Sequence, residues 1–360
     1  MAARSAQVLR SRFLWAWLAG GILAAELWGA AFFQARAASL GDPSLMGPGV
    51  RAWGMGGAFV ALAEDATAAY WNPAGIVQIR RFAITPSVTV KTTDWEALSA
   101  VTDLHRLGEL YPEKNQFTGE VEVTAMPLGF ATSRFGVNVL GEGRGQWQVD
   151  RSPTDSTSSF SSLYTVASTM TFGLPLVDLP LLGRLSAGVN LKAYNGRYQS
   201  WKEENEKVTE QSAEGQGYGV DLGLQSRLTP WVRAGLVVRD LSSDLKWKGD
   251  LPPAGEELPT RRPRVLQAGV ALCPPGGWTL AGDLVRNLDG GAESYRVGLE
   301  KTIFGVLALR GGVLMSRSEA PTATAGLGLA WGPVHLDLAA ASAEGLRRLE
   351  AASLGLAVGF

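Results

Sequence analysis

The sequence predicts an all-β fold: a transmembrane, antiparallel, up-and-down β-barrel of about 14 strands with an N-terminal hatch or plug segment inside the lumen. Three observations lead to this prediction. Apolar residues alternate with polar or small ones along most of the chain after residue 81, which places one apolar face on each strand. Most alternating segments are about 10 to 16 residues long, enough to cross a bilayer at a tilt. The connections are mostly short at one end and longer at the other, which favours a barrel over a β-sandwich.

Residues 1–37 have the layout of a secretory signal peptide. Three arginines precede an apolar block at 13–33, and the small-residue site Ala35-Arg36-Ala37 follows it. A retained membrane anchor is the alternative, because the block is nearly long enough to span a bilayer, but Glu26 interrupts it. Cleavage would remove four arginines and one glutamate and change the net charge from −1 to −4. We therefore expect export to the cell outer membrane.

Residues 38–80 form the expected hatch, ahead of a barrel at 81–360. Its glycines permit close backbone approach, and a phosphate loop is disfavoured because no Gly-Lys-Ser/Thr follows them. Asp65 is expected to cap a helical turn over 66–71, and Asn72 to end that turn and bind its own backbone. A fixed plug and a moving gate both remain open. The expected hatch or gate residues are Gly54, Gly56, Gly57, Asp65, Asn72, Pro73, Ala74 and Gly75.

The alternation defines fourteen predicted strands. They lie near 81–92, 118–132, 134–149, 160–173, 184–199, 214–227, 231–243, 263–273, 277–287, 293–302, 305–316, 322–331, 333–342 and 349–360. The longer connections include 93–117, 150–159 and 200–213, and the first of these carries apolar residues at roughly helical spacing. It is expected to cover the outer mouth, or merely to pack on itself. The turn at 174–183 is apolar, which suggests either a membrane or partner contact or packing under the barrel floor.

Polar residues on the inward faces predict a lumen network. A charge that faced lipid at the midplane would cost roughly 2–4 kcal/mol, so the charges are assigned to the lumen, where ion pairs such as Lys192 with Asp221 brace the wall and hatch. The predicted network contains Asn190, Lys192, Asp221, Arg233, Asp283, Arg296, Glu300, Arg310, His335 and Asp337.

The third predicted strand carries Gly141, Gly143 and Gly145. Repeated glycine inside a strand weakens it and marks bends, so one hypothesis is a kink that opens a lateral exit. The alternative is close packing of this strand against the hatch. In the last strand, Leu354, Leu356 and Val358 alternate up to Phe360, which resembles the C-terminal signature of outer-membrane barrels that the barrel assembly machinery reads.

The segment from Arg51 to Ile76, together with the barrel that follows, resembles the FadL-like outer-membrane transport family, including its PorV/PorQ branch. The residues that carry the resemblance are Ala52, Gly54, Met55, Gly56, Gly57, Ala58, Phe59, Val60, Ala61, Ala63, Asp65, Ala66, Ala69, Asn72, Pro73, Ala74 and Gly75. The resemblance implies a barrel that binds hydrophobic small molecules such as long-chain fatty acids and releases them sideways into the membrane. The PorV/PorQ branch implies the alternative, an accessory of protein secretion and surface attachment whose partner is a secreted protein or the secretion apparatus.

Other function classes are disfavoured. The chain has two histidines, His105 and His335, and no Ser/His/acid set is indicated, so we expect no enzyme activity. Cys273 is the only cysteine, which leaves no disulfide framework and no metal cluster, and we expect no cofactor. No basic stripe indicates nucleic acid. The expected partners are therefore outer-membrane lipids and a hydrophobic ligand.

Overall fold

The computed structural model describes residues 47–93, 95, 116–151, 156–179, 183–204, 207–250, 258–317, 320–343 and 348–359. The expected signal peptide, most of the expected loop at 93–117 and the terminal Phe360 lie outside the described residues. In the described part of the chain, no helix is long and apolar enough to cross a membrane.

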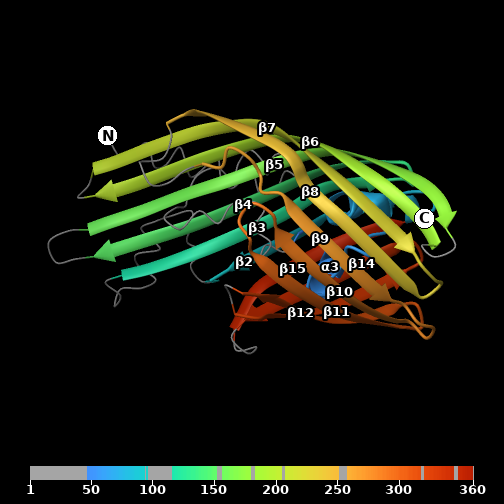
Figure 1. Ribbon diagram of the computed structural model, residues 1–360. Helices are drawn as coiled ribbons and strands as arrows, with labels where there is room; N and C mark the ends of the chain where they lie inside the picture. The colour runs from blue at the N-terminus through green and yellow to red at the C-terminus, as the bar shows by residue number, and fades with distance from the viewer. Residues whose placement is uncertain are drawn as a thin grey trace.

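The strands form one closed antiparallel sheet (Figure 1). Neighbours in the chain pair in order, and β15 closes the barrel on β1 and β2. Because β1 and β2 both lie between β15 and β3, the fifteen strands fill fourteen positions, which confirms the predicted strand number. The strands are β1 (Ala83–Ile84), β2 (Ser87–Thr92), β3 (Gln116–Ala131), β4 (Phe135–Arg151), β5 (Ser156–Leu179), β6 (Gly183–Glu204), β7 (Lys207–Arg227), β8 (Val232–Gly249), β9 (Val265–Leu272), β10 (Trp278–Asn287), β11 (Glu293–Ile303), β12 (Leu307–Ser316), β13 (Thr322–Trp331), β14 (Val334–Ala343) and β15 (Arg348–Gly359).

The wall is much taller on one side than on the other. Strands β4 to β7 have 17, 24, 22 and 21 residues, whereas β9 to β15 have 8 to 12. Figure 1 shows the long strands extending past the short ones, away from the end that holds the C-terminus. A tilted strand crosses a bilayer with about 9–11 residues, so the tall wall continues well beyond the membrane.

Two expected loops are mostly strand. The expected loop at 200–213 contains the end of β6 and the start of β7, and the expected turn at 174–183 contains the end of β5. At 200–213 the strands lie outside the bilayer and both faces meet water, so the alternation that reveals strands in the sequence is lost there. At 174–183 the alternation is broken by the shift in pairing between Pro175 and Asp178. On the outer face of β7, Leu224, Leu222 and Tyr218 are exposed, and polar Gln216 and Glu214 continue the same face beyond them.

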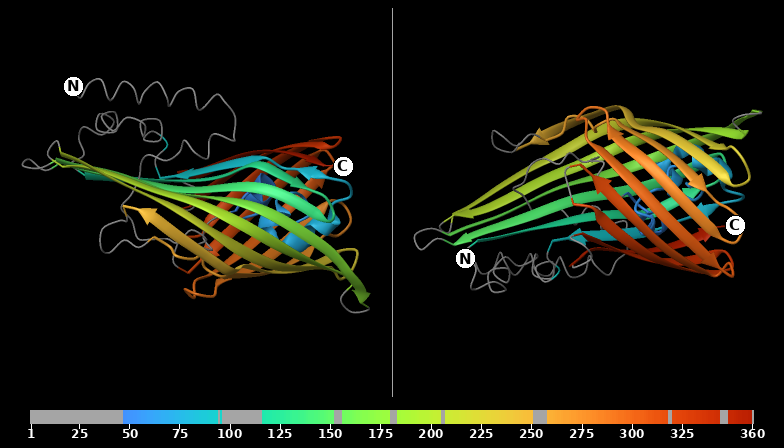
Figure 2. Two further views of the ribbon diagram at one scale, coloured as in Figure 1. Left: turned by 90° about the horizontal axis from the view of Figure 1, so that it is seen from above. Right: turned by 60° about the horizontal axis from the view of Figure 1, so that its bottom comes forward.

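The lumen at the short-turn end is filled by residues 47–80, which we call the hatch (Figure 2). The hatch contains α3 (Val50–Gly54), α4 (Ala68–Trp71) and the 3-10 helix η1 (Pro73–Gln78). Its small residues, such as Ala63 and Ala74, are fully buried, and so is the large side chain of Trp71. An alanine- and glycine-rich segment lets turns and short helices pack closely within the narrow lumen.

Candidate functional site

Asn72 is a central anchor of the hatch. Its Nδ2 donates to the backbone carbonyl of Leu224 on β7 at 2.9 Å and to that of Val60 at 3.2 Å. Its Oδ1 accepts a hydrogen bond from the backbone N–H of Ala74 at 3.2 Å. The side chain is fully buried, so these bonds satisfy groups that water cannot reach. Asn72 therefore holds its own turn, as its position in the sequence suggests, and also ties this turn to the wall.

The hatch approaches the wall closely where the strands carry inward-facing glycines. A Cβ atom on Gly188 would lie 2.2 Å from the carbonyl carbon of Pro73, and one on Gly312 would lie 2.3 Å from the backbone nitrogen of Gly56. Real side chains do not reach such distances, so these positions require glycine. We call the following set the glycine collar: Gly173, Gly188, Gly223, Gly235, Gly298, Gly312, Gly326 and Gly355, on β5 to β8, β11 to β13 and β15.

Hatch glycines make the reciprocal approach. Gly54 lies against Gly326 on β13, and Gly56, at φ 64°, lies against the backbone of Val313 on β12. Gly57, at φ 76°, lies against the side chain of Arg296. Positive φ strains other residue types, so glycine is needed here for conformation as well as for space. Within the hatch, a Cβ on Gly75 would lie 2.1 Å from the carbonyl oxygen of Ala63.

Charged lumen side chains hold the hatch backbone. One oxygen of Asp283 accepts hydrogen bonds from the backbone N–H groups of Phe59 at 2.7 Å and Val60 at 2.9 Å. Arg296 donates to the carbonyl of Gly57 at 3.4 Å, and its guanidinium lies 5.7 Å from the ring centre of Trp71.

A chain of ion pairs crosses the lumen. Glu300 on β11 pairs with Arg51 of the hatch at 2.8 Å and with Arg310 on β12 at 2.6 Å, and Arg310 pairs with Asp337 on β14 at 2.5 Å. His335 is the predicted network member that stands apart: it is exposed, two residues nearer the short-turn end of β14. Three strands are thus connected to α3 through charge-assisted bonds.

The acidic pair of the hatch has two different environments. Burial alone would raise the pKa of Glu64, but the positive charges of Arg51 and Arg233 outweigh it and lower the pKa below its ordinary value. Burial raises the pKa of Asp65 against the opposing hydrogen bonds from Thr67. Asp65 Oδ1 accepts from the Thr67 N–H at 2.7 Å and from its hydroxyl at 2.5 Å. The helical turn that follows is α4, which begins at Ala68, later than the predicted residue 66.

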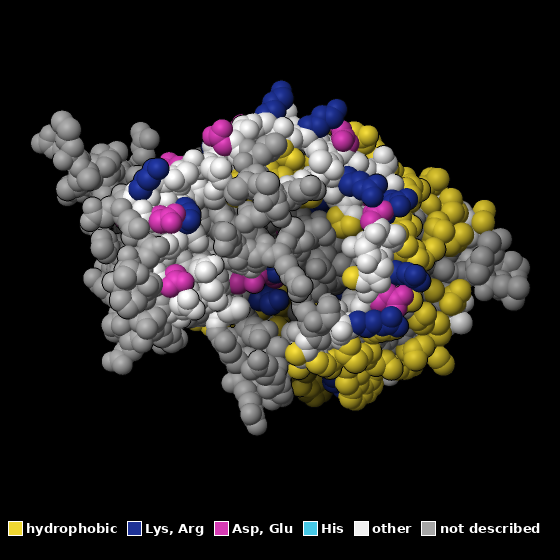
Figure 3. Space-filling model, turned by 60° about the vertical axis from the view of Figure 1, so that its left-hand side comes forward, with side chains coloured by type: hydrophobic (Ala, Val, Ile, Leu, Met, Phe, Trp, Pro, Cys, Tyr) yellow, Lys and Arg dark blue, Asp and Glu magenta, His cyan; other side chains and the backbone are white. Residues whose placement is uncertain are grey.

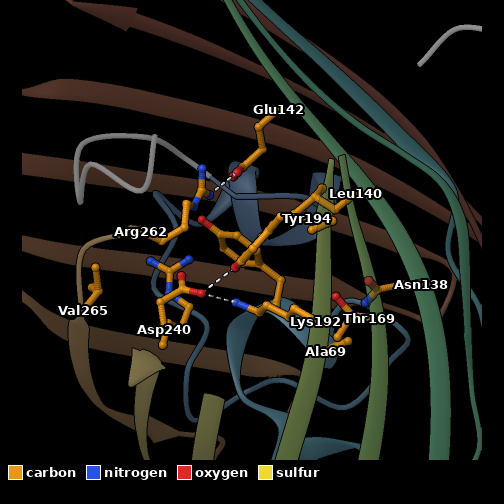
Figure 4. Close-up of a pocket in the computed structure, with 13 residues that line it drawn as sticks. Ala69, Asn138, Leu140, Glu142, Thr169, Lys192, Tyr194, Asp240, Arg262 and Val265 are labelled. Carbon is orange, nitrogen blue, oxygen red and sulfur yellow. Dashed lines mark hydrogen bonds and ion pairs between the residues drawn. The ribbon is translucent and has the colours of Figure 1, made fainter. Parts of the chain in front are cut away.

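A polar pocket lies directly above α4 (Figure 4). Asn190 donates to the carbonyl of Ala69 at 2.6 Å and to Asp221 at 2.7 Å. The Nζ of Lys192 lies 2.7 Å from Asp221 and 3.3 Å from Asp240. The network predicted around Lys192 and Asp221 therefore forms one wall of a pocket that the hatch closes from below.

The opposite side of the pocket is closed by an arginine from a connection. Arg262, just before β9, forms an ion pair with Glu142 on β4, and Tyr194 donates a hydrogen bond to Asp240. Figure 4 shows Arg262 and Glu142 meeting above Tyr194. Arg262 is buried, and among the described residues its Nε and Nη1 have no hydrogen-bond partner. The pair joins the short-wall side to the tall wall across the lumen.

An irregularity in β8 places Asp240 in the pocket. Asp240 has φ 51°, and pairing with β7 shifts between Val220 and Leu222, opposite this point. The N–H of Asp240 donates to Asp221 at 2.7 Å, which satisfies a group that leaves the ladder. Regular pairing of β8 with β9 ends at the preceding residue, Arg239, whose guanidinium lies 4.4 Å from the ring centre of Tyr70.

The pocket is small and borders an apolar cluster. Its cavity volume is about 20 Å³, enough for about one water molecule. Along its tall-wall side lies a buried cluster to which Tyr70 and Trp247 also pack. The members of this lumen cluster are Met126, Leu140, Ala167, Tyr194 and Leu245. As described, the site is closed, and a hydrocarbon-sized molecule enters only if side chains move.

The three glycines of the predicted kink lie on β4, the third position of the barrel. β4 pairs with β5 in unbroken register from Phe135 to Arg151, but its ladder with β3 is interrupted opposite Val139 and Gly141. Gly141 and Gly143 alternate with inward-facing Leu140 and Glu142 and therefore face outward, where an added Cβ would make only ordinary contacts, with Ala125 at 3.8 Å and Tyr164 at 3.5 Å, and none with the hatch. The irregularity lies one strand earlier, between Ala125 and Leu128 of β3, beside the break between β1 and β2. Proline at 86 and 127 explains both interruptions, because proline has no N–H for the ladder.

Several pocket residues were not predicted from the sequence: Tyr70, Glu142, Tyr194, Asp240 and Arg262. Asp240 lies in a bulge and Arg262 in a connection, where period-two alternation assigns no face. The inward parity of Tyr194, two residues after Lys192, and of Glu142, between the outward-facing glycines of β4, could have identified these two in advance. No group of three or more His, Cys, Asp and Glu that could hold a metal occurs among the described residues.

The outer mouth is polar. Figure 3 views the end at which the long strands finish, where basic and acidic side chains alternate around the rim and hydrophobic side chains cover the flank. On the inner face of this end, Arg144 pairs with Glu120 and, at 2.9 Å, with Glu122. The described residues of the mouth therefore carry charges of both signs.

A closed barrel with an apolar belt and a lumenal segment defines the class of outer-membrane β-barrels, and comparison with solved structures identifies the fold as FadL-like. The toluene transporter TodX of Pseudomonas putida matches with a TM-score of 0.58 at 12% identity, over 88% of this chain and 99% of that chain. The toluene transporter TbuX of Ralstonia pickettii matches with 0.54 at 13%, over 87% and 97%. A Pseudomonas aeruginosa FadL homologue matches with 0.54 at 11%, over 88% and 99%. No protein-family model and no curated protein sequence matches the chain. These likenesses confirm the predicted resemblance at the level of the fold.

Proposed function

We propose that this barrel binds hydrophobic small molecules and passes them across the outer membrane, with long-chain, fatty-acid-like molecules as the expected class. The observation that carries the proposal is the lumen cluster of Met126, Leu140, Ala167, Tyr194 and Leu245, which lies on the tall wall beside the pocket above the hatch. Binding sites for small ligands are mostly apolar with a few placed polar groups, and the cluster and pocket together have this composition. The structural neighbours, which are described as toluene transporters, support a hydrophobic ligand.

Entry requires the closing contact to open. The cavity is too small for such a molecule, and the Arg262–Glu142 pair lies across it. Parting these side chains and the apolar residues beside them enlarges the pocket without displacing the hatch. We propose that the described state is the closed form of the passage, and that the expected gate residues of the hatch act as its floor.

The release route is also a proposal. The sequence predicts a lateral exit at the glycines of β4, and the interruption of the β3–β4 ladder at Ala125–Leu128 lies opposite Gly141, close to the break between β1 and β2. Met126, in this interruption, belongs to the lumen cluster and is fully buried. A sideways route would therefore begin at the cluster and meet the wall where its ladder is weakest.

Uptake of labelled molecules tests the proposal. Cells that carry the wild-type barrel are compared with cells that lack it, with labelled oleate and labelled toluene as separate probes. Faster uptake of either probe supports passage, and the ratio of the two rates distinguishes a chain-like from an aromatic preference. Equal uptake of both probes with and without the barrel would contradict it.

One observation favours a second candidate, an accessory role in protein secretion and surface attachment. The ends of β5, β6 and β7 extend beyond the apolar belt and present polar residues such as Glu214 and Gln216 outside the membrane. A tall polar wall gives a protein partner a surface to contact. Co-purification of one defined secreted protein, together with absence of uptake, would favour this second function.

A further inference from the structure

Three arginines form a row at the short-turn mouth of the lumen. Arg184 on β6 is the register partner of Arg227 on β7, and Arg227 is the register partner of Arg233 on β8. The next inward row contains Ser186 and Gln225, which bind hatch carbonyls, so this face of the sheet is the lumen face. We call Arg184, Arg227 and Arg233 the arginine ladder.

Like charges directly opposite one another destabilise a sheet, so the ladder needs negative charge nearby. Glu64 of the hatch lies 2.7 Å from Arg233 and also 3.3 Å from Arg51, but it reaches Arg227 only at 3.8 Å. The Nε of Arg227 is buried and has no hydrogen-bond partner among the described residues. Arg184 has the acidic residue Asp178 of β5 as its register partner, whereas Arg227 lies between two arginines, so the middle arginine is the least compensated member of the ladder.

The ladder is accessible from the periplasmic side. The side chain of Arg227 is 38% exposed, and Arg184 is exposed as well. Guanidinium groups present planar pairs of donors that match the two oxygens of a carboxylate or a phosphate. An oxyanion that entered the mouth would neutralise the positive charge of the ladder that Glu64 neutralises only in part.

We propose that Arg184, Arg227 and Arg233 form an oxyanion site at the periplasmic mouth, with Glu64 as its built-in counter-ion. The ligand is a carboxylate or phosphate group, carried either by a small free anion or by a lipid headgroup. On the outer face of the β5–β6 hairpin, which carries Arg184, the apolar residues Leu174, Leu176 and Val177 are exposed next to the mouth. This apolar surface suits a lipid as one source of the oxyanion. The site is independent of the proposed passage of hydrophobic molecules.

Binding to the detergent-purified full barrel tests the site, with inorganic phosphate, short-chain phosphatidylglycerol and short-chain phosphatidylcholine as separate probes. The decisive variant is Arg227→Gln. The matched control is Arg134→Gln, an exposed arginine on the β3–β4 turn at the same rim. We expect the wild type and the control to bind phosphatidylglycerol and Arg227→Gln to lose about tenfold in affinity, the size of one lost charge-assisted hydrogen bond.

The probes separate the two sources. Binding of both phosphate and phosphatidylglycerol assigns the site to the oxyanion alone, and binding of phosphatidylglycerol without phosphate assigns it to a lipid headgroup. Equal affinity of Arg227→Gln and wild type for every probe would overturn the site, and so would absence of oxyanion binding by the wild type. Uptake of a hydrophobic probe is not measured here, so failure of the site leaves the proposed function untouched.

Thermal unfolding gives a second readout. In phosphate-free buffer, Arg227→Gln should unfold at a higher temperature than wild type, because the repulsion within the ladder is relieved. Added phosphate should raise the unfolding temperature of the wild type more than that of the variant, because a ligand stabilises the state that binds it. A purely structural arginine predicts the opposite order in phosphate-free buffer, and that result would overturn the proposal.

Discussion

The hatch meets the barrel wall in two different ways. Along β5 to β8, β11 to β13 and β15, the glycine collar brings wall and hatch together, in several places backbone against backbone, as with Gly188 and Pro73. Above α4 and along β4, the hatch is bordered instead by the polar pocket, with residues such as Asn138 and Leu140 on the wall and Tyr70 on the hatch. Backbone contact leaves no side chain that could turn aside. For the proposed passage, the comparison favours opening at the pocket beside β4 over movement of the hatch against the collar.

The largest effect is expected from a side chain added to the collar. Gly188→Val places its Cβ at a position 2.2 Å from the backbone of Pro73, which neither partner can relieve by a rotamer change. Overpacking typically lowers the free energy of unfolding by about 1–3 kcal/mol or more. We expect a loss at the upper end of this range, or complete loss of the folded barrel. The measurement is urea unfolding in lipid vesicles, followed by tryptophan fluorescence.

Gly143→Val is the matched control, since its Cβ would face outward at 3.5 Å from Tyr164. It should unfold within about 0.5 kcal/mol of wild type. If the two valine variants were equally stable, the collar would not be a close contact.

The next largest effect is expected from Asn72→Ala. The change leaves the carbonyls of Leu224 and Val60 and the N–H of Ala74 without the side-chain partner. Each buried, unsatisfied group costs about 1–3 kcal/mol, partly recovered by water, so we expect a loss of about 2–4 kcal/mol. Protease cleavage within the hatch should become faster, as read by mass spectrometry. Asn195→Ala, at an exposed position on β6, should leave the cleavage rate unchanged.

On the β3–β4 side, a smaller change should open the pocket without loosening the hatch. Glu142→Gln removes the charge that pairs with Arg262. Removing this pair should destabilise the closed state of the pocket by about 1–2 kcal/mol, which raises the population of the open state roughly 5- to 30-fold. The probe is maleimide labelling of Leu140→Cys in a Cys273→Ser background, which should become faster by that factor. Unchanged labelling would show that the ion pair does not control access, and Glu214→Gln, on the exposed outer part of β7, is the control.

The smallest expected effect is a pH dependence at the floor of the lumen. The lowered pKa of Glu64 means that its ion pairs stabilise the hatch fully above the ordinary carboxyl range, and that this contribution is lost as pH falls through the lowered value. Asp65 has a raised pKa, so its contribution to stability grows as pH falls, opposite to that of Glu64. The test therefore compares wild type with Glu64→Gln, because the difference between them isolates the contribution of Glu64. Their difference in unfolding free energy should shrink as the solution is acidified below pH of about 4, and a constant difference would contradict the assignment.

Alternation was sufficient to predict the strands within the membrane, because lipid on one side and lumen on the other impose a period of two. It failed for the outer parts of β6 and β7, where water lies on both faces. The ion pair of Lys192 with Asp221 follows from inward parity on adjoining strands, and the structure places the two 2.7 Å apart. Asp240 could not be assigned, since a bulge with positive φ takes it out of phase.

The hatch motif illustrates the same limit. An asparagine before a proline predicts that Asn72 binds the backbone of its own turn. Its hydrogen bond to Leu224 depends instead on where η1 lies in the barrel. The Arg262–Glu142 contact joins residues 120 positions apart in the sequence, one of them in a connection, and no local pattern encodes such a pairing.

Uptake of a labelled hydrophobic molecule by an Ala167→Trp variant tests the central claim most directly. Ala167 lies in the lumen cluster and lines the pocket, whereas Ala193 on the neighbouring strand faces outward and is exposed. Both tryptophan variants are compared at equal amounts in the outer membrane, with folding checked by heat-modified gel migration. We predict that Ala167→Trp abolishes the uptake that wild type and Ala193→Trp retain. Undiminished uptake by folded Ala167→Trp would contradict a passage through this side of the lumen.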